Sequence, residues 1–244
     1  MVALKAVVRP ADIRAITLDL DDTLWPVWPA IERAEHELHA WLAVHASATA
    51  RRFDASALRG LRDAVVSEFP QWAHDFSRLR RESLVRALTL AGDDHALAGP
   101  AYDVFFAARN RVEFYADALP ALQALASRWP IAALTNGNAD LHAIGVAPYF
   151  KTVVSAREFG VGKPDARIFL EACRQLGAAP HQVLHIGDDW ALDVAGAHAA
   201  GLRSAWVRRD DTAAHEAKDR GEVRPDRVVR DLEELVAWLS GEAV

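Results

Sequence analysis

The feature that most constrains the fold is a series of short apolar runs, each long enough for one strand, with helical patterns between the later ones. Strands that alternate with helices of this length are typical of a parallel sheet covered by helices on both faces. We therefore expect an α/β fold with a Rossmann-like core. The runs are RAITLDL (14–20), IAALT (131–135), TVVSA (152–156), VLHIG (183–187), RSAWV (203–207) and RVV (227–229). The helical patterns cover about 117–128, 164–176, 190–200 and 231–240.

One long segment, residues 25–109, interrupts this alternation. It contains no convincing strand, whereas its apolar residues recur several times at helical spacing. It is too long for a loop, so we expect an inserted helical domain. Asp54 or Ser56, and Asp93, are candidates for residues that begin helices within it. The predicted domains are a Rossmann-like core, 1–24 with 110–244, and a helical cap, 25–109.

Composition excludes several classes of protein. The chain has 244 residues and a formal net charge of −6, which argues against general binding to nucleic acids or anionic membranes, because both need a basic surface. No apolar run reaches the roughly 18 residues of a membrane span, and the N-terminal segment lacks the pattern of a signal peptide. Cys173 is the only cysteine, which excludes an internal disulfide and a thiolate zinc site. We expect a cytoplasmic enzyme or binding protein, monomeric or homodimeric, whose partner is a small molecule.

Polar residues follow four of the predicted strands. In an open parallel sheet ligands bind outside the carboxyl ends of the strands, so we expect these residues to converge on one rim. His185 lies inside a strand and is expected only to pack there, and Asp22 is expected to lie in a solvated turn. The four clusters are Asp19 to Thr23 (DLDDT), Thr135-Asn136-Gly137-Asn138, Gly160 to Pro164 with Lys163, and Gly187-Asp188-Asp189 with Asp193 one helical turn later.

The chemistry of these clusters is complementary. Ionised carboxylates at the end of a buried strand repel one another and need a compensating cation. Asp19 and Asp188 offer the hard oxygen ligands that Mg²⁺ prefers, and Lys163 supplies a fixed positive charge. An anion site beside a metal site, with a carboxylate nucleophile, indicates phosphoryl transfer through an aspartyl phosphate. The donors to anionic oxygens would be Thr135 and the backbone N–H groups of Asn136 and Gly137.

The motifs DxDxT, TNG, Lys-Pro and GDDxxxD, in this order over residues 19–193, resemble the haloacid dehalogenase-like superfamily in its phosphatase branch. The helical insertion directly after the first motif is similar to that family's first type of cap. The resemblance implies a Mg²⁺-dependent phosphatase in which Asp19 is the nucleophile. It also implies that Asp21 protonates the leaving oxygen and then activates water, while its backbone carbonyl binds the metal together with Asp19 and Asp188.

The same resemblance implies supporting roles for other residues. Thr135 and Asn136 would hold the phosphoryl oxygens, with Gly137 beside them, and Lys163 would neutralise the nucleophile and the phosphate. Thr23 is expected to position the side chain of Asp21. The waters of the metal would be oriented by one of two candidates, Asp189 or Asp193, although Asp193 could instead only cap a helix.

Other branches of the superfamily compete with this interpretation. Its dehalogenases keep the first aspartate but lack the acid–base aspartate and need no metal, so Asp21 and Asp188 favour a phosphatase. Its phosphonatases use a lysine of the cap, and residues 25–109 contain none. A phosphoglucomutase-like isomerase and a silent phosphate-binding protein stay open as alternatives, although an intact Asp19, Asp21 and Lys163 favours an enzyme.

The cap is expected to choose the substrate. Trp25 and Trp28 follow the nucleophile loop, so at least one could face the site, where an aromatic wall would suit a flat ring. The whole chain, including RWPIAALTNGNA and VLHIGDD, is similar to bacterial flavin mononucleotide (FMN) phosphatases of this superfamily. That similarity implies FMN or 5-amino-6-(5-phospho-D-ribitylamino)uracil as substrate, with Trp25 as a contact. A sugar phosphate and phosphoglycolate are the alternatives.

Overall fold

The computed structural model describes residues 10–209 and 223–241, which form two compact units. Within these residues the first unit contains the chain up to Trp25, Phe114–Asn136 and the chain from Val146 onward. The second unit contains Pro26–Glu113 and Gly137–Gly145. Each unit has its own cluster of buried apolar side chains.

A parallel six-stranded sheet runs through the first unit and confirms the predicted fold class. The strand order is β3-β2-β1-β4-β5-β6, so β1 lies in the middle of the sheet between β2 and β4. Every run that was predicted to be a strand forms one. The strands are β1 (Ala15–Leu18), β2 (Ile131–Thr135), β3 (Thr152–Ser155), β4 (Val183–Gly187), β5 (Arg203–Val207) and β6 (Arg227–Val229).

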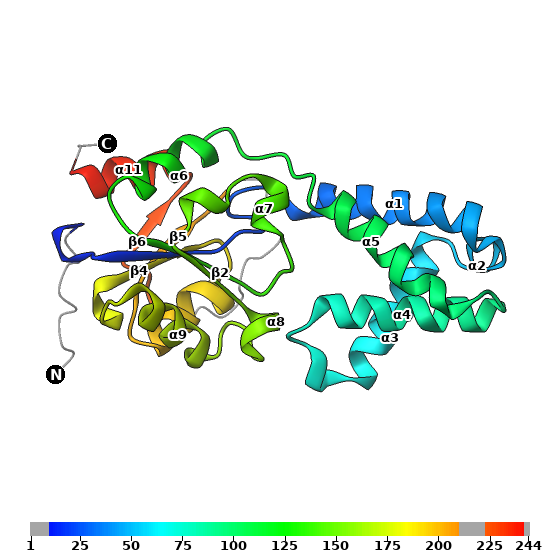
Figure 1. Cartoon of the computed structure of the whole chain (residues 1–244). Helices are drawn as coiled ribbons and strands as arrows, with labels where there is room; N and C mark the ends of the chain where they lie inside the picture. The colour runs from blue at the N-terminus through cyan, green and yellow to red at the C-terminus, as the bar shows by residue number, and fades with distance from the viewer. Residues whose placement is uncertain (1–9, 210–222, 242–244) are drawn as a thin grey trace. The chain divides into compact units, whose positions relative to one another are not determined.

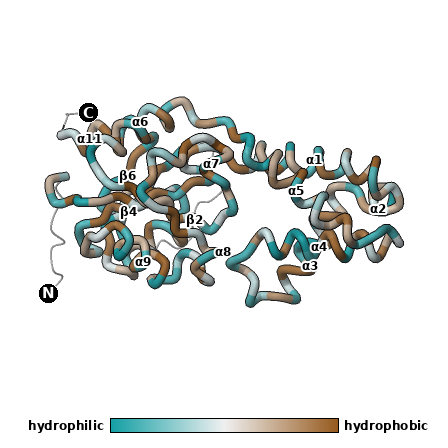
Figure 2. Tube along the Cα trace, viewed as in Figure 1, coloured by the Kyte–Doolittle hydropathy of each residue, from teal (hydrophilic) through white to brown (hydrophobic). Residues whose placement is uncertain are grey.

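The three central strands owe their position to continuous apolar sequence. Every residue of β1, β2 and β4 is buried, as expected for parallel strands with helices on both faces. Ile16 pairs with Ile131 of β2 on one side and with Leu184 of β4 on the other. Figure 2 shows the hydrophobic colouring along this part of the sheet. The strand that carries the first motif is therefore held rigidly from both sides.

Helices cover the two faces of the sheet. Helices α6 (Ala118–Ala126) and α11 (Leu232–Ser240) pack against each other, and α9 (Ala166–Leu176) packs on β2 and β3. Figure 1 shows α9 on the opposite side of the sheet from α6 and α11. Short helical turns complete the unit: η1 (Pro10–Asp12), η4 (Ala147–Tyr149), α8 (Ala156–Phe159), η5 (Pro180–Gln182), the π-helical η6 (Trp190–Ala195) and α10 (Gly196–Ala199).

The second unit is helical. Helix α1 packs along α5, and α3 packs on α4, with leucines four residues apart on α1 and α4 facing a shared core. Among the described residues no helix combines the length and the apolar character that a membrane crossing requires. The elements are α1 (Val27–His45), α2 (Ser47–Arg52), α3 (Ala55–Glu68), η2 (Pro70–Trp72), α4 (Phe76–Ala91), η3 (His95–Leu97), α5 (Ala98–Arg109) and α7 (Leu141–Ile144).

Two predicted helix starts have different outcomes. The side chain of Asp54 accepts a hydrogen bond from the backbone N–H of Ala57 at 2.7 Å and caps α3, as predicted. Asp93 is not the N-cap of the helical turn that follows it, and this prediction was wrong. Its carboxylate accepts from both the backbone N–H and the hydroxyl of Thr49, at 2.7 Å each, while its neighbour Asp94 caps η3.

The segment 137–145, which was assigned to the core from the sequence, packs with the helical unit. Asn138 accepts a hydrogen bond from Arg109 Nε at 3.0 Å and donates to Ser77 Oγ at 3.2 Å. Two residues later, the backbone N–H of Asp140 donates to Asn110 Oδ1 at 2.9 Å. Side chains of α4 and α5 therefore supply the polar partners of this loop.

The chain leaves the first unit after Trp25 and returns to it at Phe114. The backbone N–H of Tyr115 donates to the carbonyl of Leu24 at 3.0 Å. The outgoing and incoming segments are thus joined by a hydrogen bond within the first unit. The role of the inserted helices as a substrate-covering cap stays a prediction.

Candidate active site

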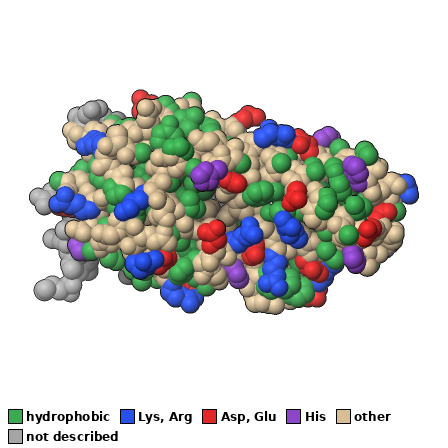
Figure 3. All heavy atoms as spheres, viewed as in Figure 1, with side chains coloured by type: hydrophobic (Ala, Val, Ile, Leu, Met, Phe, Trp, Pro, Cys, Tyr) green, Lys and Arg blue, Asp and Glu red, His purple; other side chains and the backbone are tan. Residues whose placement is uncertain are grey.

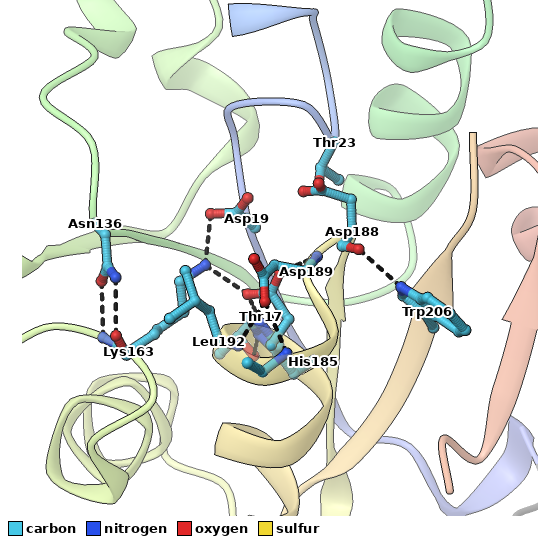
Figure 4. A network of polar contacts seen from close by, with 12 residues as sticks. Thr17, Asp19, Thr23, Asn136, Lys163, His185, Asp188, Asp189, Leu192 and Trp206 are labelled. Carbon is cyan, nitrogen blue, oxygen red and sulfur yellow. Dashed lines mark hydrogen bonds and ion pairs between the residues drawn. The ribbon is translucent and has the colours of Figure 1, made fainter. Parts of the chain in front are cut away.

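Four of the predicted site residues meet at the carboxyl ends of the central strands, and Figure 4 labels three of them, Asp19, Lys163 and Asp188. Asp19 directly follows β1, Asp188 directly follows β4, and Lys163 lies in the loop that precedes α9. Asp193 comes from η6, one turn beyond the fourth motif. The convergence on one rim that the sequence predicted is therefore present for these residues.

Lys163 is the centre of the cluster. Its ammonium Nζ donates to Asp19 Oδ1 and to Asp193 Oδ1, at 2.6 Å each, and the side chain is 2% exposed. Burial alone would lower the pKa of Lys163, but the two carboxylates outweigh it and raise the pKa above its usual range. Lys163 is therefore a permanent cation, and it links two carboxylates that are 144 and 30 residues away along the chain.

Asp193 is held from several directions. Its Oδ1 also lies 2.9 Å from Nε2 of His185, and its Oδ2 accepts from the backbone N–H of Asp189 at 2.9 Å. Burial would raise the pKa of Asp193, but the charge of Lys163 and the hydrogen bond from His185 hold it below its ordinary value. A Cβ at Gly187 would overlap the Asp193 carboxylate, so only glycine fits at the end of β4.

The hydrogen-bond partners of Asp189 and Asp193 differ. The carboxylate of Asp189 accepts from the backbone N–H groups of Ala191 and Leu192, at 2.7 and 2.8 Å, and so caps η6. Asp193 caps nothing and joins the cluster through Lys163. The helix-capping role therefore belongs to Asp189, and these contacts favour Asp193 for the supporting role beside a metal, which stays a prediction.

The cluster carries more negative than positive charge. Oxygen atoms of Asp19, Asp188 and Asp193 all lie within 4.8 Å of one another, with one lysine between two of them. Burial, partly offset by Lys163, raises the pKa of Asp19 to about 7. Burial and the charges of Asp19 and Asp193 raise the pKa of Asp188 to about 9. The raised pKa values mean that these carboxyl groups lose their protons more readily when a cation binds between them. A buried group of carboxylate oxygens of this kind fits Mg²⁺, which prefers hard oxygen ligands.

Asp21 has a partner that the sequence analysis had assigned elsewhere. Trp25 Nε1 donates to Asp21 Oδ1 at 2.8 Å, and the indole ring is fully buried, edge-on to Phe114 at 5.4 Å. Trp25 therefore offers no exposed ring to a substrate, and the prediction of an aromatic wall at this residue was wrong. The turn passes through Asp22, whose φ of 61° is left-handed, a conformation that aspartate tolerates better than most residues. The role of Asp21 as acid and base stays a prediction.

Thr23 has a partner that its prediction did not include. Its hydroxyl donates to Asp188 Oδ1 at 3.0 Å, and its predicted positioning of Asp21 stays a prediction. Trp206 Nε1 donates to the Asp188 carbonyl at 2.7 Å, and Arg209 donates to the Thr23 carbonyl at 2.9 Å. Asp188 and the end of the nucleophile loop are thus positioned by two residues that the motifs did not reveal.

The side chain of Asn136 is used within the protein. Its Nδ2 donates to the Lys163 carbonyl at 2.9 Å, and its Oδ1 accepts from the Lys163 backbone N–H at 2.7 Å. This pair holds the lysine loop, and the role of Asn136 toward the phosphoryl group stays a prediction. A Cβ at Gly162 would overlap Asn136 Oδ1, which explains the glycine before Lys163. Thr135 is buried at the end of β2, and its role, like those of the Asn136 and Gly137 backbone N–H groups, stays a prediction.

His185 is the residue near the site that sequence reasoning treated as packing alone. It does pack, edge-on to Phe169 with ring centroids 5.0 Å apart, but both ring nitrogens also have partners. Nδ1 lies 2.9 Å from the Thr17 hydroxyl, and Nε2 lies 2.9 Å from Asp193. The one available signal was a histidine and a threonine within two otherwise apolar central strands.

Comparisons with known proteins agree with this geometry. A family model described as haloacid dehalogenase-like hydrolase matches residues 13–201. The 5-amino-6-(5-phospho-D-ribitylamino)uracil phosphatase YigB of Escherichia coli (strain K12) is 36% identical over 203 residues, covering 82% of this chain and 85% of that protein. The phosphoserine phosphatase of Thermus thermophilus is 36% identical over 177 residues, covering 67% of this chain and 65% of that protein.

A solved structure is also similar over most of its length. The crystal structure of a 2-haloacid dehalogenase from Pseudomonas syringae pv. Tomato DC3000 is 36% identical, with a TM-score of 0.84. The similarity covers 94% of this chain and 99% of that one. The relatives therefore agree on one family while their names differ in the reaction.

Proposed function

The chain belongs to the haloacid dehalogenase-like hydrolases, and we propose that it is a Mg²⁺-dependent phosphatase that acts through an aspartyl phosphate on Asp19. The phosphatase relatives identify it as a phosphoric monoester hydrolase. One observation supports the mechanism most strongly. Lys163 bridges Asp19 and Asp193 at 2.6 Å each, beside Asp188, in a buried cluster that holds three carboxyl groups and one cation.

The proposed reaction has two steps. The Asp19 carboxylate attacks phosphorus, the bond to the ester oxygen breaks, and that oxygen takes the proton held by Asp21. Asp21 then removes a proton from a water molecule, whose oxygen attacks phosphorus and releases inorganic phosphate and the free Asp19 carboxylate. Lys163 stays protonated throughout and offsets the negative charge at Asp19 and the phosphoryl group.

The metal would be held by Asp19 and Asp188, with the backbone carbonyl of Asp21, and would stabilise charge on the phosphoryl oxygens. Thr23 and Trp206 would keep Asp188 oriented toward it through the hydrogen bonds described above. Thr135 and the backbone N–H groups of Asn136 and Gly137 would hold the remaining phosphoryl oxygens. Asp193 would accept a hydrogen bond from the Lys163 ammonium and so keep it in place beside Asp19.

The substrate that we propose is FMN, 5-amino-6-(5-phospho-D-ribitylamino)uracil, or both. The Escherichia coli relative, 36% identical across most of both chains, is named for the second compound. The resemblance of the sequence to flavin mononucleotide phosphatases supports the first. A sugar phosphate or phosphoglycolate would be the alternative substrate on the same machinery.

A 2-haloacid dehalogenase is the second candidate, because the similar Pseudomonas syringae structure bears that name. Halide displacement needs no protonation of the leaving group. Asp21 and Asp188 favour the phosphatase, since halide displacement would use neither an acid–base residue nor a metal ligand. A silent phosphate-binding protein would keep the fold without turnover.

Hydrolysis of p-nitrophenyl phosphate tests the reaction class. We expect turnover that EDTA abolishes and Mg²⁺ restores, and no turnover by Asp19→Asn. Halide release from 2-chloropropionate in place of phosphate release would establish the dehalogenase, and binding of inorganic phosphate without either reaction would establish the silent protein. Turnover of FMN and the ribitylaminouracil phosphate is then compared with a panel of sugar phosphates. A tenfold preference for a hexose phosphate or phosphoglycolate, about 1.4 kcal/mol, would reject the proposed substrates.

The proposal also keeps the partner and location predictions: a small phosphate ester, no nucleic acid, no membrane, a monomer or homodimer, and the cytoplasm. On the face shown in Figure 3, basic and acidic side chains are interspersed, and no patch of one sign dominates. This supports a small-molecule partner over a polyanion, which would need a continuous basic surface.

A further inference from the structure

We propose that His185 and Thr17 are positioning residues: they hold the Asp193 carboxylate, and through it they hold the Lys163 ammonium against the nucleophile Asp19. The inference rests on the proposed phosphatase activity, in which Asp19 is the nucleophile. Neither residue touches the nucleophile itself. Their effect on catalysis would pass through Asp193.

A continuous line of polar contacts leads from the interior of the sheet to Asp19 (Figure 4). The Thr17 hydroxyl lies 2.9 Å from His185 Nδ1, and His185 Nε2 lies 2.9 Å from Asp193 Oδ1. The same Asp193 oxygen accepts from Lys163 Nζ at 2.6 Å, and Lys163 donates onward to Asp19 at 2.6 Å. Thr17 and His185 are both fully buried, so water cannot replace either partner.

The strands place these groups in register. Thr17 of β1 is paired directly with His185 of β4. Side chains two residues apart on a strand point to the same face of the sheet. If the alternation of β1 is extended by one residue to Asp19, Thr17 and Asp19 lie on the same face. The pair therefore lies under the cluster, on the most rigid part of the fold.

The proton positions follow from the partners. An ionised Asp193 can only accept, so the His185 nitrogen that faces it, Nε2, must carry a hydrogen. Burial favours the neutral ring, whose Nδ1 is then an acceptor for the Thr17 hydroxyl. Every polar atom of the pair is satisfied in this arrangement, with one direction for each hydrogen bond.

Packing alone does not account for the pair. Burial of an imidazole and a hydroxyl costs free energy that valine or leucine would avoid. What the pair adds is a second donor on the Asp193 oxygen that Lys163 uses, while Asp189 N–H holds the other oxygen. Asp193 is then fixed at both oxygens, and Lys163 cannot draw it away from its place beside Asp19. Supporting hydrogen bonds of this kind are typically worth about 10- to 100-fold in activity.

The test compares His185→Phe, which keeps a ring of similar size, with His185→Gln, which keeps a donor and an acceptor. We expect kcat of the folded protein on p-nitrophenyl phosphate to fall about 10- to 100-fold for His185→Phe, with KM within threefold, and to recover in part for His185→Gln. Thr17→Val should lower kcat by a smaller factor. The double variant Thr17→Val/His185→Phe should be no slower than His185→Phe alone, because the two residues act in series.

His198→Phe is the matched control. His198 lies in the same unit, with Nε2 3.0 Å from Ser204 Oγ and 3.7 Å from Asp226 Oδ2. We expect this variant to lose thermal stability without loss of kcat. An unchanged kcat in folded His185→Phe, a rise in KM alone, or Thr17→Val and His185→Phe effects that multiply would overturn the inference. If His185→Phe does not fold, Thr17→Val and His185→Gln carry the same comparison.

A measurement on the wild-type protein separates this inference from the proposed function. The ¹⁵N resonances of the histidine side chains should show His185 as a neutral ring with hydrogen on Nε2, exchanging slowly with water. A charged ring, or hydrogen on Nδ1, would overturn the positioning geometry even in an active phosphatase. An inactive wild-type protein with the expected tautomer would instead reject the proposed function.

Discussion

Two clusters of charge among the described residues, one in each unit, are built around buried carboxylates, and they have opposite compositions. In the core unit three aspartates surround Lys163. In the helical unit the buried Glu35 is surrounded by three arginines, at 2.5 Å for Arg59 and 3.7 Å for Arg62 and Arg80. One cluster has an excess of negative charge and the other an excess of positive charge.

Access to water separates the two clusters. The arginine side chains around Glu35 are 36%, 26% and 12% exposed, so solvent compensates their excess charge. Lys163 and Asp193 are each 2% exposed, and water cannot do the same for them. Burial and the neighbouring Arg62 lower the pKa of Arg80 to about 10, which still leaves it charged at neutral pH. Arginines and solvent therefore compensate the charge of Glu35, whereas the buried aspartate cluster fits a cation from outside the chain.

The largest expected effect separates the two clusters by activity. Asp19→Asn should lower kcat by more than about 10⁴-fold, while Asp21→Asn, which removes only the general acid and base, should lose about 10²- to 10⁴-fold. Glu35→Gln should leave kcat within twofold. Steady-state rates on p-nitrophenyl phosphate measure all three. Equal residual rates for the two aspartate variants would contradict the proposed division of roles, and a large loss for Glu35→Gln would remove the contrast between the clusters.

Removal of a cation from each cluster should give the next largest difference. Lys163→Met leaves buried carboxylates without their partner, and we expect a loss of about 3–5 kcal/mol in unfolding free energy at pH 8. Arg80→Met leaves Glu35 with two arginines and should cost about 1–2 kcal/mol, mainly through lost contact with Phe105. Urea unfolding in EDTA measures both. Similar losses in the two variants would show that burial does not distinguish the clusters.

The pH dependence of metal binding is a third test. In the metal-free protein the pKa values of Asp19 and Asp188 are about 7 and 9, against an ordinary 3.8. The folded state thus binds more protons than the unfolded state between these limits, so stability should fall as pH rises from about 4 to 9. Mg²⁺ replaces those protons and should raise the melting temperature more at pH 8 than at pH 5. The depressed pKa of Asp193 acts only at lower pH. A shift independent of pH would count against these ligands.

The smallest effect should come from an exposed ion pair. Arg33 and Glu113 lie 3.2 Å apart in the helical unit, with 32% and 81% of their side chains exposed. Glu113→Gln should change the unfolding free energy by less than about 0.5 kcal/mol, because solvent and salt screen such pairs. Differential scanning calorimetry at low and high salt would measure it. A loss comparable with that of Lys163→Met would mean that exposure is a poor guide to the energetics of charge in this protein.

The sequence predicted the strands and the motif residues well because each is marked by a short continuous pattern: an apolar run for a strand, and a polar motif directly after it for the site. The apolar runs of β1, β2 and β4 are uninterrupted, and Asp19, Lys163 and Asp188 follow the rule that places ligands at carboxyl ends. What the local pattern does not contain is the choice of partner across the sheet. Thr23 is two residues from Asp21, yet its hydroxyl reaches Asp188, 165 residues away.

The roles of side chains that combine an apolar ring with a polar nitrogen were the hardest to predict from the sequence. Trp25 could equally line a ligand site or fill a core, and the buried indole hydrogen-bonded to Asp21 takes the second role. His185 looked like packing because it lies in an apolar strand, but its two nitrogens join Thr17 to Asp193. The loop 137–145 follows a core strand, yet the partners of Asn138 come from the helical unit. In each case tertiary contacts decide between roles that the sequence allows equally.

The hydrogen bond between Leu24 and Tyr115 makes the helical insertion a replaceable module. Closing an inserted segment costs little extra conformational entropy when the two points at which it leaves and re-enters the core are already held together. Modules from relatives with other preferences could therefore be grafted between these two residues to retarget the enzyme. Since Asn138 has its partners on α4 and α5, a successful graft should transplant 137–145 together with the helices.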